Sequence, residues 1–78
     1  MPTILREKGY RFFFFSNENQ EPPHIHVQQA ERYAKFWLRP VRLAKNVGFR
    51  RKEITQLGRI VSERRSLLLK AWYGHLGK

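Results

Sequence analysis

The sequence predicts an α+β domain: an antiparallel four-stranded sheet (a meander), followed by one long or two short C-terminal helices packed on one of its faces. Two observations predict this class. Short segments with alternating apolar residues fill residues 1–38 between turn formers, a pattern typical of strands and hairpins. From Arg51 the apolar residues recur with a period of about 3.6, the period of an amphipathic helix. Short turns favour an antiparallel meander, and the helical stripe must cover one sheet face.

Two strands joined by a tight turn are expected at the N-terminus. Residues 3–6 form the first, and residues 7–9 form a hairpin turn in which Gly9 is free to adopt a positive φ angle. The second strand, residues 10–16, contains four consecutive phenylalanines, which predicts a central strand covered on both faces. The alternative is that one face is open and carries Phe13 and Phe15 for binding.

A histidine pair marks the third strand, residues 24–28, which follows a polar loop ending in two prolines. Successive side chains of a strand point to opposite faces. Ile25 and Val27 are therefore expected in the core, and His24 and His26 side by side on the outer face.

A turn at residues 29–32 precedes the fourth strand, residues 33–38. Alternation assigns three of its side chains to the core, namely Ala34, Phe36 and Leu38. The other three are expected to share the histidine face, namely Tyr33, Lys35 and Trp37. Pro40 ends this strand, Val41 and Leu43 tuck against the sheet, and residues 46–48 make a turn.

The C-terminal third predicts helix. Residues 51–63 and 66–75 are interpreted as two helices because Arg64 falls on the apolar stripe, where a break tolerates it. Ser66 is the expected N-cap of the second helix, and Gly77 is expected to end it. A single continuous helix is the alternative.

Length and composition predict one cytoplasmic domain spanning residues 1–78. The chain has no cysteine, so neither disulfides nor a thiolate metal site are expected. No apolar run approaches the roughly 20 residues of a membrane span, and the first residues lack the features of a signal peptide. We therefore expect no contact with a membrane.

The formal net charge of +10 is unevenly distributed. Five basic and four acidic residues give residues 1–38 a charge of +1, whereas eleven basic and two acidic residues give residues 39–78 a charge of +9. Between Arg39 and Lys52 there are six basic residues and no acid. Such asymmetry favours a polyanionic partner, although a solvated basic surface would have the same composition.

Catalysis by the histidine pair is one hypothesis. One imidazole would take the 2′-hydroxyl proton of RNA and the other would protonate the leaving oxygen, because histidine populates both protonation states near neutrality. The candidate catalytic residues are His24, His26 and Lys35, with Arg11 as an alternative cation for the phosphate. Zinc binding is disfavoured because two histidines are too few ligands, so neither a metal nor a cofactor is expected.

Binding without chemistry is the second hypothesis, because basic and aromatic groups on a sheet face neutralise phosphates and stack bases. The candidate nucleic-acid-binding residues are Arg11, Trp37, Arg39, Arg42, Lys45, Arg50, Arg51, Lys52 and Arg59. A protein–protein module is a third hypothesis, with Trp72, Tyr73 and Leu76 as anchors, and homodimerisation is left open. The alternative for these three side chains is that they close the helix against the sheet.

Several segments carry a family resemblance: Gly9–Glu18, Glu21–Val27, Ala34–Leu38, Pro40-Val41, Leu43-Ala44, Gly48-Phe49, Leu68 and Trp72. Together they closely resemble the small bacterial family called domain of unknown function 4160. The resemblance implies a cytoplasmic α+β domain beside a partner of the domain of unknown function 2442 family, in an arrangement that looks like a toxin–antitoxin pair. It brings no established reaction, and this chain is markedly more basic in its helical region than the family pattern.

The sequence therefore predicts a toxin-like component of a two-gene module that binds or cleaves a nucleic acid, RNA rather than DNA. The alternative is a non-catalytic nucleic-acid-binding or protein-interaction module. The two differ in whether the histidines matter for activity or only the arginines and lysines do.

Overall fold

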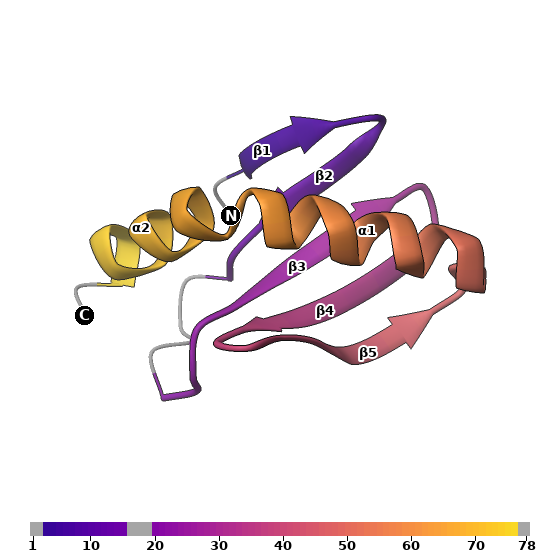
Figure 1. Cartoon of the computed structure of the whole chain (residues 1–78). Helices are drawn as coiled ribbons and strands as arrows, with labels where there is room; N and C mark the ends of the chain where they lie inside the picture. Colours follow the sequence, from indigo (N-terminus) through magenta and orange to yellow (C-terminus); the bar gives the residue numbers. More distant parts are fainter. Residues whose placement is uncertain (1–2, 16–19, 77–78) are drawn as a thin grey trace.

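The fold is a five-stranded antiparallel sheet with two helices across one face (Figure 1). The computed structural model describes residues 3–15 and 20–76. Its elements are β1 (Thr3–Glu7), β2 (Tyr10–Phe13), β3 (His24–Gln29), β4 (Arg32–Leu38), β5 (Val41–Val47), α1 (Arg51–Glu63) and α2 (Arg65–Leu76). The strands follow one another in the order β1-β2-β3-β4-β5. The predicted α+β class and meander are confirmed, but the predicted number of strands is wrong.

The strand that the sequence did not predict is β5. Residues expected to tuck against the sheet, Val41 and Leu43, instead pair with Leu38 and Phe36 of β4. Asn46 and Val47, expected in a turn, also belong to this strand. The strand lies at the sheet edge and is exposed along most of its length. An exposed edge strand needs no apolar alternation, so its sequence lacks the usual signal.

The predicted hairpin turn between β1 and β2 is present. Lys8 and Gly9 both have positive φ angles, 54° and 84°, as a two-residue turn requires if it is to match the twist of its strands. The turn pairs Glu7 with Tyr10 and Arg6 with Arg11. This register decides which side chains of β1 and β2 share a face.

The core lies between the sheet and the helices. Alternate residues of β2, β3 and β4 meet the apolar stripe of α1 and α2 there, as predicted for Ile25, Val27 and the inward residues of β4. The main buried members are Phe12, Phe14, Ile25, Val27, Ala34, Phe36, Leu38, Leu57, Ile60, Val61, Leu68 and Trp72. Trp72 closes the α2 end of this core edge-to-face against Phe14, with the ring centroids 5.3 Å apart.

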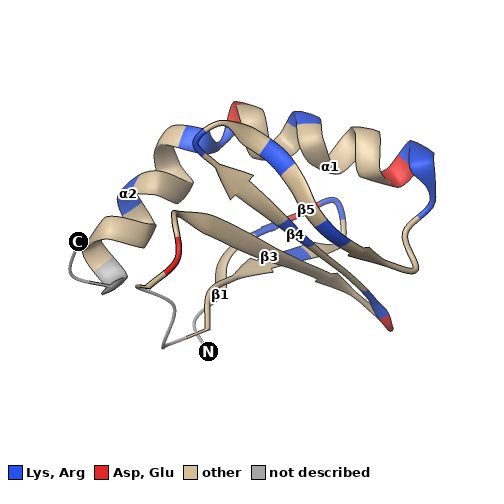
Figure 2. Ribbon diagram, turned by 90° about the horizontal axis from the view of Figure 1, so that it is seen from below, with Lys and Arg blue, Asp and Glu red and all other residues tan. Residues whose placement is uncertain are grey.

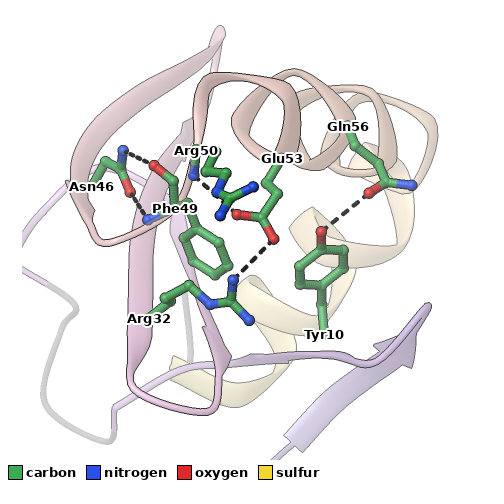
Figure 3. A network of polar contacts seen from close by, with 7 residues as sticks. All are labelled: Tyr10, Arg32, Asn46, Phe49, Arg50, Glu53 and Gln56. Atoms are coloured by element: carbon green, nitrogen blue, oxygen red, sulfur yellow. Dashed lines mark hydrogen bonds and ion pairs between the residues drawn. The ribbon is translucent and has the colours of Figure 1, made fainter.

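A polar network fixes the beginning of α1 on the sheet (Figure 3). Glu53 accepts hydrogen bonds from the Arg50 backbone N–H at 2.9 Å and from the Arg32 guanidinium at 3.2 Å. The Tyr10 hydroxyl donates to Gln56 Oε1 at 3.1 Å. Burial, and secondarily the Glu53 carboxylate, raises the pKa of Tyr10, although Arg32 opposes this. The network therefore joins β2 and β4 to the first two turns of α1.

α1 and α2 are two separate helices, which confirms the predicted break near Arg64 and not the alternative of one continuous helix. Arg64 lies between them, and its side chain turns outward to form an ion pair with Glu7 at 3.0 Å. Ser66 lies within α2, which begins at Arg65, so its predicted role as N-cap is wrong. The expected stop at Gly77 lies outside the described residues. Neither helix in the described part of the chain is long and apolar enough to cross a membrane.

Candidate nucleic-acid interface

The sheet face turned away from the helices, called the outer face below, collects the basic and aromatic side chains of four strands. Figure 2 shows both helices on the opposite side of the sheet. Cross-strand pairing sets Trp37 beside Arg42 and Lys35 beside Lys45. It also places Arg11 beside Gln28, at the β2 side of this face. Four cations and one aromatic residue of the predicted set therefore share one surface: Arg11, Lys35, Arg42, Lys45 and Trp37.

A β-bulge in β5 brings Arg42 and Lys45 to this same face. Residues three apart in a regular strand point to opposite faces. Here Lys45 pairs with Lys35 and Leu43 pairs with Phe36, so Ala44 is an extra residue in the ladder. Such a bulge re-aims the side chains that follow it. Both cations are exposed, and within the described residues neither forms an ion pair.

Lys35 and Trp37 form the middle of the outer face. The Lys35 ammonium lies 4.6 Å from the centroid of the Trp37 ring and donates to Glu21 Oε1 at 2.7 Å. The lysine side chain is only 17 % exposed, whereas the Glu21 side chain is 49 % exposed. The carboxylate of the preceding loop thus neutralises Lys35 at the centre of the face, whereas Arg42 and Lys45 of β5 are exposed.

Arg6 is a basic residue of the outer face that the sequence reasoning missed. The hairpin register sets it directly opposite Arg11. Arg11 itself donates to Thr3 Oγ1 and to Gln28 Oε1 and lies over the Phe13 ring. The signal for Arg6 was available, because a two-residue turn at Lys8 and Gly9 dictates this pairing.

The two imidazoles are buried, and the expectation that they lie open on the outer face is wrong. His24 is 0 % exposed and His26 is 3 % exposed. Phe13 and Phe15 pack on His26, with ring centroids 5.4 Å and 4.5 Å away, and Trp72 of α2 lies 4.7 Å from His24. Alternation predicted the face of each histidine but not what would cover it.

Each imidazole also has a specific polar partner. His24 Nδ1 lies 2.9 Å from the Pro22 carbonyl oxygen, which can only accept, so this nitrogen carries the proton. His26 Nδ1 lies 2.7 Å from the Tyr33 hydroxyl. The ring centroids of the two histidines are 5.0 Å apart, and Lys35 pairs with His26 across the strands. The three candidate catalytic residues are thus together, but the imidazoles are enclosed by side chains that a substrate would have to displace.

The remaining predicted binding residues lie elsewhere. Arg39, in the turn between β4 and β5, donates to the Tyr73 hydroxyl at 2.8 Å. Arg50, Arg51, Lys52 and Arg59 belong to the start and the solvent side of α1. An open hollow beside this helix is lined by Tyr10, Arg51, Lys52, Glu53, Thr55, Gln56 and Arg59. The structure therefore divides the predicted basic set between the outer face and α1.

Two further predictions concern metals and docking anchors. Among residues 3–15 and 20–76, no three histidine, cysteine or acidic side chains lie close enough together to hold a metal ion. Trp72 is a core residue, and Tyr73 is 37 % exposed. Of the three proposed anchors, Trp72 is therefore an internal packing residue.

Comparison with known proteins gives one match. The model of the protein family described as "Domain of unknown function (DUF4160)" matches residues 9–73, which is most of the chain. No curated protein and no solved structure matches it.

Proposed function

The chain belongs to the DUF4160 family, as its sequence predicted, and the family name assigns no activity. From the geometry we propose that the domain binds single-stranded RNA on its outer face without cleaving it. The observation that carries this proposal is the register of β4 and β5. It sets Trp37 beside Arg42 and Lys35 beside Lys45 on a face that the helices leave open.

The arrangement suits a flexible single strand. Exposed cations two pairing positions apart can contact successive phosphates, and aromatic rings beside them can stack bases. Phe15, 39 % exposed, and the half-buried Trp37 supply the rings. A base that stacks on Trp37 takes the place of the Lys35 ammonium, which keeps its ion pair with Glu21. Binding would be sensitive to salt because phosphate contacts release counterions.

The burial of the two imidazoles disfavours cleavage of a bound RNA. General acid–base catalysis needs each group within hydrogen-bond reach of the proton it transfers. Phe13 and Phe15 pack on His26, and both imidazoles are almost completely buried, so neither reaches a strand lying on the outer face. The toxin-like role, and the partner of the domain of unknown function 2442 family, stay predictions of the family resemblance.

The test compares two charge-reversed variants that have the same net charge. Arg42→Glu with Lys45→Glu reverses the two exposed cations that β5 contributes to the outer face, and Arg51→Glu with Lys52→Glu makes the same change on α1. We expect the first variant to bind a fluorescent single-stranded RNA of about ten nucleotides at least tenfold more weakly in an anisotropy titration, because each phosphate contact contributes to affinity. The α1 variant should lose much less affinity.

Two results would contradict the proposal. Equal losses in both variants would mean that net charge, and not the outer face, determines binding. Wild-type protein that fails to bind the RNA even at low salt would exclude the function altogether. A parallel titration with DNA of the same sequence measures the expected preference for RNA.

A further inference from the structure

The edge of the sheet that β5 forms lies next to the basic residues of the outer face, and it has no strand beside it in the described part of the chain. β5 is last in the strand order and pairs along one edge with β4, and no described strand covers its other edge. It is seven residues long, and six of these are exposed. In Figure 2 this edge faces the viewer, with basic positions on β5 and at the start of α1. An uncovered strand edge presents N–H and C=O groups that can pair with another strand.

The opposite edge, β1, is less available. It has five residues, three of which are partly buried, and its Glu7 is held by Arg64 of the interhelical link. β5 also carries two of the exposed large apolar side chains of the described chain, Leu43 at 40 % and Val47 at 48 %. Of the two sheet edges, β5 therefore offers the longer backbone template and the more accessible apolar contacts.

Charge determines which strand fits this edge. Arg42 and Lys45 lie on the outer face of β5 and make no ion pair within the described residues. A second copy of β5 would set these cations against cations, which is a known way for proteins to prevent pairing between identical edges. A strand with acidic residues at alternate positions would place its carboxylates beside both.

We propose that the β5 edge accepts an acidic β-strand of a partner protein and extends the sheet to a sixth strand. The backbone of the partner pairs with β5, its alternate carboxylates face Arg42 and Lys45, and its intervening apolar side chains contact Leu43. This interaction goes beyond RNA binding. Because it neutralises two cations of the outer face, the docked strand weakens binding of RNA.

The test uses a synthetic peptide of alternating glutamate and valine, about nine residues long, which is the length of a long natural strand. Amide hydrogen exchange of the full chain, read by nuclear magnetic resonance, reports docking directly. We expect the peptide to slow exchange of those β5 N–H groups that point away from β4. The same peptide with glutamine in place of glutamate should bind about tenfold more weakly, since charge complementarity is lost.

Two controls separate strand pairing from simple charge attraction. An acidic peptide methylated on the backbone nitrogens that would face β5 keeps its charge. It lacks those N–H donors, and its methyl groups hold the two strands apart, so its carbonyls should not reach and protect the β5 amides. The Arg42→Glu, Lys45→Glu variant should reject the glutamate peptide and accept a lysine–valine peptide, whereas the Arg51→Glu, Lys52→Glu variant should behave as the wild type does.

Several outcomes would overturn the proposal. The acidic peptide could bind without protecting β5, or the methylated peptide could bind equally well. The chain could dimerise in sedimentation experiments with β5 amides protected, which would assign the edge to a second copy. If the chain binds RNA but binds none of the peptides, β5 takes part only in RNA binding and accepts no partner strand. Peptide protection without RNA binding would instead remove only the RNA function.

Discussion

At the scale of single residues, the histidine pair is a packing element of the outer face. His26 lies between the Phe13 and Tyr33 rings, and His24 between His26 and Trp72. Truncating a buried ring leaves a cavity and frees its polar partner.

We therefore expect His26→Ala to lower the free energy of unfolding by about 2–4 kcal/mol, measured by urea denaturation. The double variant with His24→Ala should not fold, because a small domain has a total stability of only about 5–15 kcal/mol. Purified wild-type protein should leave RNA intact with EDTA present. A histidine variant that folds normally but loses an RNA cleavage activity of the wild type would make the pair catalytic.

Tyr10 is expected to make the free energy of unfolding depend on pH in the alkaline range. Its pKa is raised above 10.0, mainly by burial, so the folded state resists ionisation more than the unfolded state does. Stability from this group is present below pH 10 and is lost as the pH rises further.

Tyr10→Phe should cost about 1 kcal/mol at neutral pH through loss of the hydrogen bond to Gln56. The difference between wild type and variant should shrink above about pH 10, where the wild type alone loses this contribution. Urea denaturation of both proteins across that range measures it. A difference that stays constant with pH would contradict the role of Tyr10.

At the scale of elements, the turn between β3 and β4 stores strain that the sequence does not relieve. Ala30 has a φ angle of 55°, in the left-handed region that disfavours a side chain. We expect Ala30→Gly to stabilise the domain by about 0.5–1 kcal/mol, as an increase in the midpoint of thermal unfolding. Ala34→Gly, in the neighbouring strand β4, is the control and should destabilise. A lower midpoint for Ala30→Gly would show that the turn relaxes in solution.

At the scale of the whole molecule, the charge of +10 is arranged on distinct surfaces. One is the outer face with the β5 edge, and the other is the solvent side of α1, separated from it by the sheet and core. Net charge alone attracts any polyanion. At a defined site, the loss of binding affinity depends on which cations are replaced. For this reason the two charge-reversed variants, which have the same net charge, distinguish a defined site from general attraction. The slope of log affinity against log salt should fall by about 1.4 when two phosphate contacts are lost on the outer face.

The sequence by itself determined the α+β class, the hairpin turn, the inward residues of β3 and β4 and the family. The structural features follow from local alternation and turn chemistry, which a single segment already contains, whereas the family follows from the resemblance of several segments. Tertiary structure alone decided that β5 is a strand, since an exposed edge has no apolar pattern, and that a bulge at Ala44 aligns Arg42 with Lys45. It also decided that the histidines are buried, because Phe15 and Trp72 reach them from other parts of the chain. Alternation says to which face a side chain points, and only packing says whether that face is open.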